Sequence, residues 1–123
     1  MRDRTQNRRL AEAAGRRAEA IAAWWLRLKG YRIVAQGFRS PLGEIDIVAR
    51  RGGIVAFVEV KRRATHAGAI EAIQPRQRQR IARAARLYLQ SMPALARLQP
   101  RFDAVVLVPG HRPRHLPAAW SDT

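Results

Sequence analysis

The sequence predicts a single α/β domain over residues 1–123, with a mixed β-sheet flanked by helices in the order αβββαβ. Two segments, 10–29 and 75–90, place apolar residues at helical spacing. Because the second helix separates the third and fourth strands, we expect a crossover connection and therefore a parallel pair. The four segments with strand composition are 31–38, 43–50, 54–62 and 102–108.

The first predicted helix, 10–29, follows a polar and basic segment, 1–9, which we interpret as a frayed arm or a first helical turn. Gly30 suits the position just after a helix, where a left-handed backbone is common. We expect Trp24 and Trp25 to be core or partly buried residues. The apolar face of the helix follows a spacing of three or four residues and comprises Leu10, Ala14, Ala18, Ile21, Trp25 and Leu28.

A charged hairpin is the most informative feature of the sequence. Two apolar strand segments flank residues 51–53, Arg-Gly-Gly, which is a signal for a tight turn. If the two glycines form a two-residue turn, Asp46 lies opposite Glu59. The same register places Glu44 opposite Lys61. Because alternate residues of a strand share a face, the four charges then meet on one patch, whereas a longer turn would offset the two strands.

The second half of the chain contains fewer sequence motifs that indicate structure or function. Residues 64–73 predict a loop, and Pro75 suits the first turn of the helix that follows. A linker is expected at 92–100 and an interior strand at 102–108, because the latter is almost continuously apolar. The prolines of 109–123 predict a mostly irregular C-terminal segment.

A few other residues carry separate expectations. Gly37 indicates a bulge or a turn within its strand. Asp103 is expected to make a structural hydrogen bond or to pair with an arginine, and Trp120 to pack onto the body. The three histidines have no metal-ligand spacing, and we interpret them as surface residues: His66, His111 and His115.

Composition favours a polyanionic partner. The chain has 24 basic and 9 acidic residues and a net charge of +15, an imbalance that most often indicates nucleic-acid binding. We expect phosphate contacts from a set of arginines, each of which could also be an ordinary solvated residue: Arg62, Arg63, Arg76, Arg78, Arg80 and Arg83. There is no cysteine, no apolar run near the roughly 20 residues that span a bilayer, and no signal-peptide pattern. We therefore expect a cytoplasmic protein without a membrane partner.

The acidic residues of the hairpin predict a metal site. Mg²⁺ or Mn²⁺ prefers oxygen ligands, keeps several waters, and can activate water for phosphodiester hydrolysis. Asp46 and Glu59 are the natural ligands, and the carbonyl of Val60 is a plausible third. Lys61 could orient the attacking water or stabilise developing charge. Glu44 could assist as a ligand or instead pair with Lys61.

At these residues the sequence resembles a known superfamily. Asp46, followed after a gap by Glu59-Val60-Lys61, resembles the signature of the restriction-endonuclease-like, or PD-(D/E)xK, nucleases. The residue before Asp46 is Ile45 rather than the proline of that signature. Four ordered segments resemble the YraN-like family of small bacterial proteins, which has no firmly assigned activity: 15–19, 43–46, 57–61 and 101–103.

The resemblance implies an αβββαβ core similar to that of archaeal Holliday-junction resolvases, with the site on the central hairpin. It implies that Glu19 approaches this site from the first helix, although a solvated helix position is equally compatible with the sequence. A family lysine near the start of the second long helix is replaced here, where Arg76 and Arg78 stand. Because the resolvases act as dimers, a homodimer is also implied.

Three functional hypotheses follow. The first is a metal-dependent endonuclease acting on DNA rather than RNA, at branched or damaged structures. The second is a non-catalytic nucleic-acid-binding protein that keeps the nuclease-like fold. The third is an interaction protein whose partner has an acidic surface. The catalytic set of the first hypothesis is Asp46, Glu59, Lys61, Glu44 and Glu19.

Overall fold

The computed structural model describes residues 3–68, 71 and 73–121. Its sheet has five strands in the spatial order β1-β2-β3-β4-β5. β3 and β4 run parallel, and the other neighbouring strands run antiparallel. The predicted mixed sheet and crossover are therefore confirmed. The elements are α1 (Arg4–Leu28), β1 (Arg32–Ser40), β2 (Gly43–Arg51), β3 (Ile54–Arg62), α2 (Pro75–Ser91), α3 (Pro93–Ala96), β4 (Gln99–Leu107) and β5 (Arg114–Trp120).

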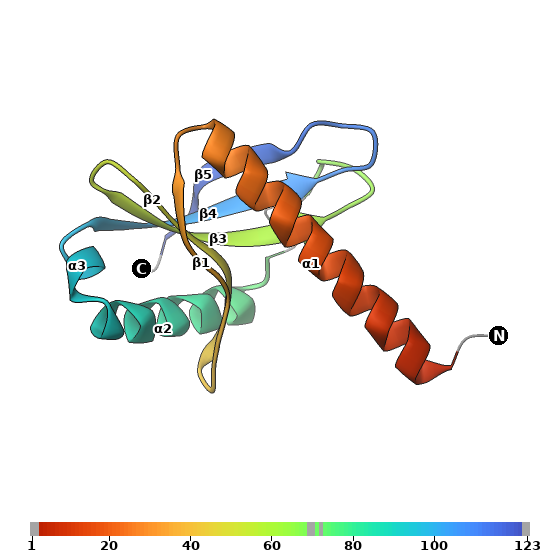
Figure 1. Cartoon of the computed structure of the whole chain (residues 1–123), viewed down its shortest axis with the longest axis horizontal. Coiled ribbons are helices and arrows are strands. Elements are labelled where there is room, and N and C mark those ends of the chain that lie inside the picture. Colours follow the sequence, from red (N-terminus) through yellow and green to blue (C-terminus); the bar gives the residue numbers. More distant parts are fainter. Residues whose placement is uncertain (1–2, 69–70, 72, 122–123) are drawn as a thin grey trace.

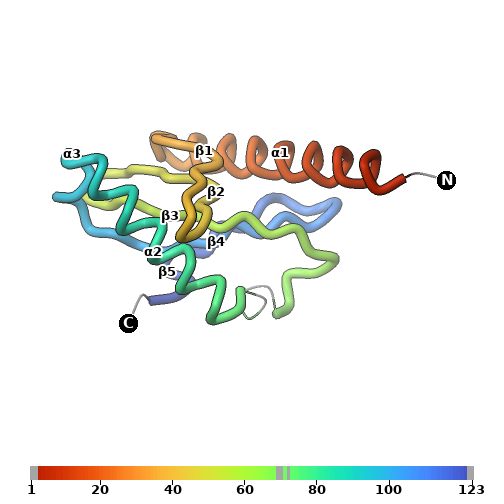
Figure 2. The backbone as a smooth tube through the Cα atoms, turned by 90° about the horizontal axis from the view of Figure 1, so that it is seen from below, coloured from red at the N-terminus to blue at the C-terminus, as the bar shows by residue number. Residues whose placement is uncertain are grey.

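Helices cover both faces of the sheet (Figures 1 and 2). The core around α1 includes Ile47 and Val58, whereas the core around α2 includes Val48 and Phe57. This division follows from the pleat, since neighbouring residues of a strand point to opposite faces. The buried residues of α2 are Ile81, Ala82, Ala84, Ala85 and Tyr88, which agrees with the predicted helical period.

The hairpin of β2 and β3 has the predicted two-residue turn. Arg51 pairs with Ile54, and the antiparallel ladder continues to the pair of Ile47 and Val58. Gly52 has φ +56, a left-handed conformation that glycine adopts without steric cost. The turn therefore sets the predicted register as far as Ile47 and Val58. Two expected pairs lie beyond the last pair of this ladder, namely Asp46 with Glu59 and Glu44 with Lys61.

α1 begins earlier than the sequence predicts. Its N-cap is Asp3, whose carboxylate accepts a hydrogen bond from the backbone of Gln6 at 2.8 Å as part of a capping box. Residues 4–9 are therefore helical, which agrees with the first helical turn, and not with the frayed arm, of the two interpretations given for this segment. At the other end, Gly30 has φ +93, as expected of a residue just after a helix.

α1 also buries a different face from the one predicted. Its buried residues are Ala18, Ala22, Ala23 and Leu26. Trp24 is 63% exposed, contrary to the expectation of burial. Small alanine side chains let the helix approach the sheet closely but contribute little to a hydrophobic pattern. The larger apolar residues that suggested the face are instead exposed, namely Leu10, Ile21 and Leu28.

Two C-terminal elements are absent from the sequence prediction. α3 occupies part of the segment expected to be a linker, and β5 lies within the segment expected to be mostly irregular. β5 is an edge strand, where Pro117 is tolerated because the outer side needs no ladder hydrogen bond. Trp120 is buried and stacks on Phe102 with ring centroids 5.5 Å apart, so its predicted packing is confirmed.

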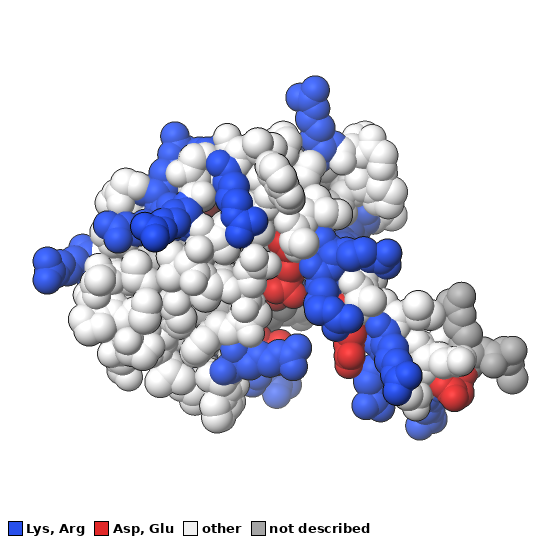
Figure 3. Space-filling model, viewed as in Figure 1, with Lys and Arg blue, Asp and Glu red and all other residues white. Residues whose placement is uncertain are grey.

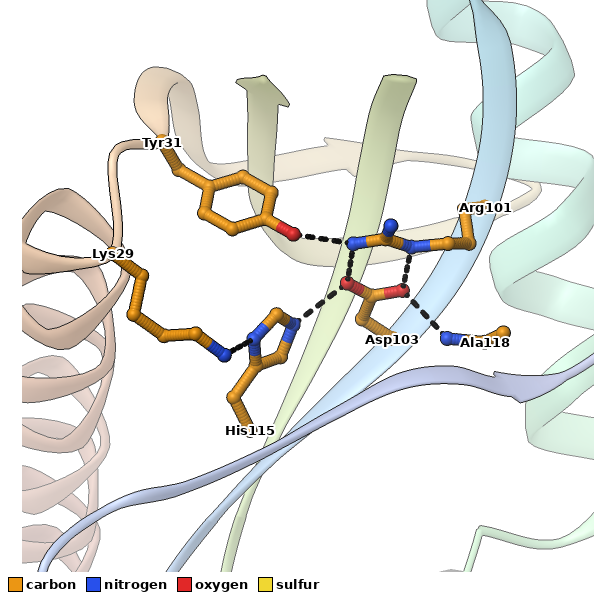
Figure 4. A network of polar contacts seen from close by, with 6 residues as sticks. All are labelled: Lys29, Tyr31, Arg101, Asp103, His115 and Ala118. Carbon is orange, nitrogen blue, oxygen red and sulfur yellow. Dashed lines mark hydrogen bonds and ion pairs between the residues drawn. The ribbon is translucent and has the colours of Figure 1, made fainter. Parts of the chain in front are cut away.

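The buried carboxylate of Asp103 is the centre of a hydrogen-bond network that joins β4 and β5 (Figure 4). Asp103 on β4 is fully buried and accepts two hydrogen bonds of 2.8 Å from Arg101. It also accepts from the backbone of Ala118 at 3.0 Å and contacts His115 Nε2 at 2.8 Å. Burial alone would raise the pKa of Asp103, but the hydrogen bonds from His115 and Arg101 lower it. The structural role expected of Asp103 is therefore confirmed.

The same network reaches the end of α1. Lys29 contacts His115 Nδ1, and Arg101 donates to the hydroxyl of Tyr31 at 2.6 Å (Figure 4). The side chain of His115 is only 1% exposed, which corrects its interpretation as a surface histidine. These contacts tie α1 to β4 and β5 and hold the helix against the sheet. Among the described residues, no helix is long and apolar enough to cross a membrane.

Candidate functional site

Charged side chains from β2, β3 and α2 meet around a cavity of about 230 Å³, which we call the acid pocket. Asp46 and Glu59 face α2 because they alternate with core residues that face α1. In Figure 3, acidic side chains lie in a hollow beside α1, with basic side chains on both sides. The pocket is lined by Glu44, Asp46, Glu59, Gln77, Arg80 and Ile81.

Glu59 is the most buried acid of the pocket, with 7% of its surface exposed. Its Oε1 lies 3.2 Å from Lys61 Nζ and accepts a hydrogen bond from Gln77 Nε2 at 2.8 Å. Burial and the nearby charge of Asp46 raise the pKa of Glu59 to about 7, although Lys61 opposes this shift. The carboxylate is therefore costly to ionise in the free protein.

Asp46 approaches β3 through its side chain. The backbone N–H of Val60 donates a hydrogen bond to Asp46 Oδ2 at 2.8 Å. Burial raises the pKa of Asp46, and this hydrogen bond opposes the shift. The sequence predicts that the carbonyl of Val60 binds a metal. The hydrogen bond to Asp46 is made by the N–H of Val60, and the carbonyl as a metal ligand stays a prediction.

The other two predicted acids lie at the margin. Glu44 is exposed and lines the acid pocket. Glu19 on α1 lies in a neighbouring hollow with Gly37, which has φ +67, and Arg39. Burial, followed by the charge of Asp46, raises the pKa of Glu19. The register shift of β1 falls between residues 33 and 35 rather than at Gly37.

The six arginines predicted to bind phosphate do not share one surface. Arg80 lines the acid pocket, and two others on the same helix, Arg76 and Arg83, are exposed. Arg78 Nε donates to the carbonyl of residue 73 at 2.8 Å and so braces the start of α2. Arg62 lines an apolar hollow beside α1, whereas Arg63 donates its backbone N–H to Leu107 on β4. Of these six arginines, Arg80 is the one that lines the acid pocket.

Two residues of the acid pocket would hold a divalent cation of the Mg²⁺ type if one binds there, namely Asp46 and Glu59. Glu59 is buried, Asp46 is half-buried and Glu44 is exposed. These three acids outnumber the two basic residues beside them, Arg80 and Lys61. In the described part of the chain, no group of three or more His, Cys, Asp or Glu side chains is arranged to hold a metal ion. Mg²⁺ keeps several waters and needs only one or two carboxylates, which Asp46 and Glu59 supply.

Gln77 is the site residue that sequence reasoning missed. Its amide links both partners of the ion pair, because Nε2 donates to Glu59 and Oε1 accepts from Lys61 Nζ at 3.1 Å. One sequence signal could have identified it. Gln77 lies one helical turn before Ile81, at the end of the apolar face of α2. That face packs on the sheet, so a polar residue at its end points toward the charged hairpin.

Comparisons with known proteins identify a family that this chain matches over most of its length. The model of "Uncharacterised protein family UPF0102" matches residues 18–107, a span that contains Asp46, Glu59, Lys61 and Gln77. The chain belongs to the UPF0102 family.

Bacterial members of the UPF0102 family are similar to the chain over most of its length. A UPF0102 protein of Paramagnetospirillum magneticum is 54% identical over 114 residues, covering 89% of this chain and 88% of the relative. One from Maricaulis maris is 51% identical over 116 residues and covers 94% and 91%. One from Caulobacter vibrioides is 49% identical over 110 residues and covers 89% and 88%. These names carry no activity, so function must be argued from the site.

Proposed function

We propose that this UPF0102 protein is a metal-dependent endonuclease that hydrolyses DNA phosphodiester bonds and has a restriction-endonuclease-like core. The observation that carries the proposal is the acid pocket. Asp46 and Glu59 lie there side by side, and Lys61 is held 3.2 Å from Glu59. Two carboxylates and a lysine on one hairpin face supply the groups that metal-assisted phosphodiester hydrolysis requires.

Each group has a distinct role in this proposal. Asp46 and Glu59 would hold Mg²⁺ or Mn²⁺, with Glu44 and the carbonyl of Val60 as further candidate ligands. When bound, the metal would lower the pKa of a water and neutralise phosphate charge. The ammonium group of Lys61 would hold the water or the scissile phosphate oxygens. Hydrolysis then forms one P–O bond from water and breaks another, and the leaving oxygen takes a proton.

The surroundings of the pocket favour a nucleic acid as the substrate. The net charge is +15, and Arg76, Arg80 and Arg83 extend from the pocket along α2. Such a row suits a phosphate backbone, because arginine forms bidentate contacts with phosphate oxygens. The preference for DNA, and for branched or damaged DNA, rests on the resemblance to resolvases.

Cleavage of a DNA panel tests the proposal. Duplex, single-stranded, flap and four-way-junction DNA are incubated with Mg²⁺ or Mn²⁺ and with the wild type, Asp46→Asn, Glu59→Gln or Lys61→Met. Glu12→Gln serves as a matched control, because Glu12 is an exposed acid outside the pocket. We expect cleavage by the wild type and the control only, with all variants folded by circular dichroism. Full cleavage by Asp46→Asn would show that another site is responsible.

A second candidate function is non-catalytic nucleic-acid binding. It is favoured by the pairing of Lys61 with Glu59 and Gln77, which occupies the lysine in the free protein. This function predicts binding whose affinity falls steeply with salt, without metal-dependent cleavage. Failure to bind any nucleic acid at low salt would instead favour a partner protein with an acidic surface. The homodimer implied by the resolvases stays a prediction, which sedimentation analysis can check.

A further inference from the structure

The N-terminal half of α1 projects away from the sheet. Figures 1 and 2 both show the helix running past the edge of the sheet toward the N-terminus. Every residue from 4 to 12 is exposed, and burial begins only at Ala18. Short helices without packing partners are marginally stable in water. We call residues 4–17 the α1 arm.

One face of α1 changes from buried apolar residues to exposed arginines where the helix passes the edge of the sheet. Residues spaced three or four apart lie on the same side of a helix. The face that carries Glu19 therefore continues toward the N-terminus through positions 15 and 12 to Arg8 and Arg4. Toward the C-terminus it continues through Ala22 and Leu26, which are buried against the sheet. The helix face that packs on the sheet at its C-terminal end therefore carries arginines at its N-terminal end, beyond the sheet.

The charge of the α1 arm identifies the kind of partner. Its acidic residue is Glu12, against five arginines: Arg4, Arg8, Arg9, Arg16 and Arg17. Leu10 is its large apolar residue, so the arm lacks an apolar face for another protein. A second copy of this chain would bring arginines against arginines, which is unfavourable at a net charge of +15. A phosphate backbone supplies the opposite charge.

The C-terminal end of the α1 arm lies beside the candidate site. Arg16 and Glu19 line the same hollow, together with Arg39 of β1. Arg39 of this hollow pairs with Glu44 of the acid pocket in the β1–β2 ladder, so the hollow and the acid pocket are close neighbours. A nucleic acid lying across the pocket would therefore meet the arm as soon as it leaves the pocket on the α1 side.

We propose that the α1 arm is a second nucleic-acid contact, which binds the backbone of a double-stranded flank beside the acid pocket. This inference rests on the proposed function. The distance from Arg4 to Arg16 along the helix is about 18 Å, from 12 steps of about 1.5 Å each. That length corresponds to about five base pairs at about 3.4 Å each. The substrate class is then DNA with a duplex flank of at least about five base pairs.

Binding without metal tests this proposal separately from cleavage. Arg4→Gln/Arg8→Gln removes two charges from the arm face and keeps good helix formers. The matched control is Arg27→Gln/Arg97→Gln, two exposed arginines that lie outside the α1 arm. Fluorescence anisotropy in EDTA compares a fluorescent junction with arms of 12 base pairs and one with arms of three, at several salt concentrations.

We expect the arm variant to reduce the slope of log affinity against log salt by roughly 1.8 on the long-armed DNA, since each phosphate contact contributes about 0.9. The short-armed DNA should show little change, and the control should keep the wild-type slope on both. Hydroxyl-radical footprints should shorten by about five base pairs in the arm variant. An unchanged slope, or an equal loss in the control, would overturn the proposal. If the arm variant shows the expected loss of slope but the wild type cleaves no DNA, the arm proposal stands and the proposed nuclease function is contradicted.

Discussion

At the scale of single residues, the acid pocket contains a carboxylate that is costly to ionise. Glu59 is buried beside another carboxylate, and its pKa is raised to about 7. A group whose pKa is higher in the folded state than in the unfolded state binds more protons when folded. For an acid, this stabilises the folded protein at low pH and withdraws that stability as the pH rises.

This predicts an effect of Glu59→Gln that depends on pH. In EDTA, the wild type should lose stability between about pH 4.5, the unfolded value, and about pH 7, the folded value. Glu59→Gln should remove most of this slope and increase the free energy of unfolding above pH 7 by about 1–3 kcal/mol. Urea unfolding at pH 5 and pH 8 measures the difference. A variant less stable than the wild type at pH 8 would contradict the raised pKa.

Gln77 supports a second prediction at this scale. Its Nε2 donates to Glu59 Oε1 at 2.8 Å, and hydrogen bonds to a carboxylate favour its charged form. Gln77→Ala should therefore raise the pKa of Glu59 further, as followed by carboxyl carbon chemical shifts in an NMR titration. Gln79→Ala changes an exposed glutamine of the same helix and is the control. A pKa that moves equally in both variants would show that Gln77 has no specific role.

At the scale of elements, the site depends on how the β1–β2 hairpin meets α2. Gly43 begins β2, and a Cβ added there would collide with the backbone carbonyl group of Arg80 on α2. This close approach places Glu44 and Arg80 around the same pocket. Backbone atoms cannot move aside as the end of a flexible side chain can.

Gly43→Ala should therefore separate the hairpin from α2 and destabilise the protein by about 1–3 kcal/mol, the usual cost of overpacking. Gly53→Ala is the matched control, because a Cβ there meets nothing within 4 Å. Thermal or urea unfolding of both variants measures the effect. Equal stability of the two variants would mean that the contact is not tight.

At the scale of the whole molecule, charge connects the fold with the proposed ligand. The chain has a net charge of +15, yet in its acid pocket three acids outnumber the two nearby basic residues, Arg80 and Lys61. A divalent cation would therefore bind locally in spite of the overall repulsion. Any ligand that binds only the folded state increases stability through its concentration relative to its Kd.

Mg²⁺ should accordingly stabilise the wild type at pH 8 by about 2.7 kcal/mol at 100 times its Kd. Differential scanning calorimetry should show a higher Tm with Mg²⁺ for the wild type and for Glu12→Gln, but no increase for Asp46→Asn. The effect should weaken below about pH 7, where Glu59 becomes protonated. An equal Tm increase in Asp46→Asn would place cation binding outside the acid pocket.

The sequence by itself determined the order of most elements and the outline of the charged hairpin. The period of α2, the glycine turn and the alternation of Asp46, Glu59 and Lys61 depend on residues close in the chain. Local backbone geometry converts such patterns directly into helices, turns and strand faces. For the same reason the register and the parallel crossover could be predicted.

Only the tertiary structure decided which distant side chains meet. The alanines of α1 hide its buried face, because a small side chain gives a weak hydrophobic signal while allowing close packing. The burial of His115 depends on Asp103 and Lys29, which come from other elements. Gln77 becomes a site residue only when α2 packs beside β3. Contacts of this kind follow from how faces pack in space, which the local periods of a sequence do not encode.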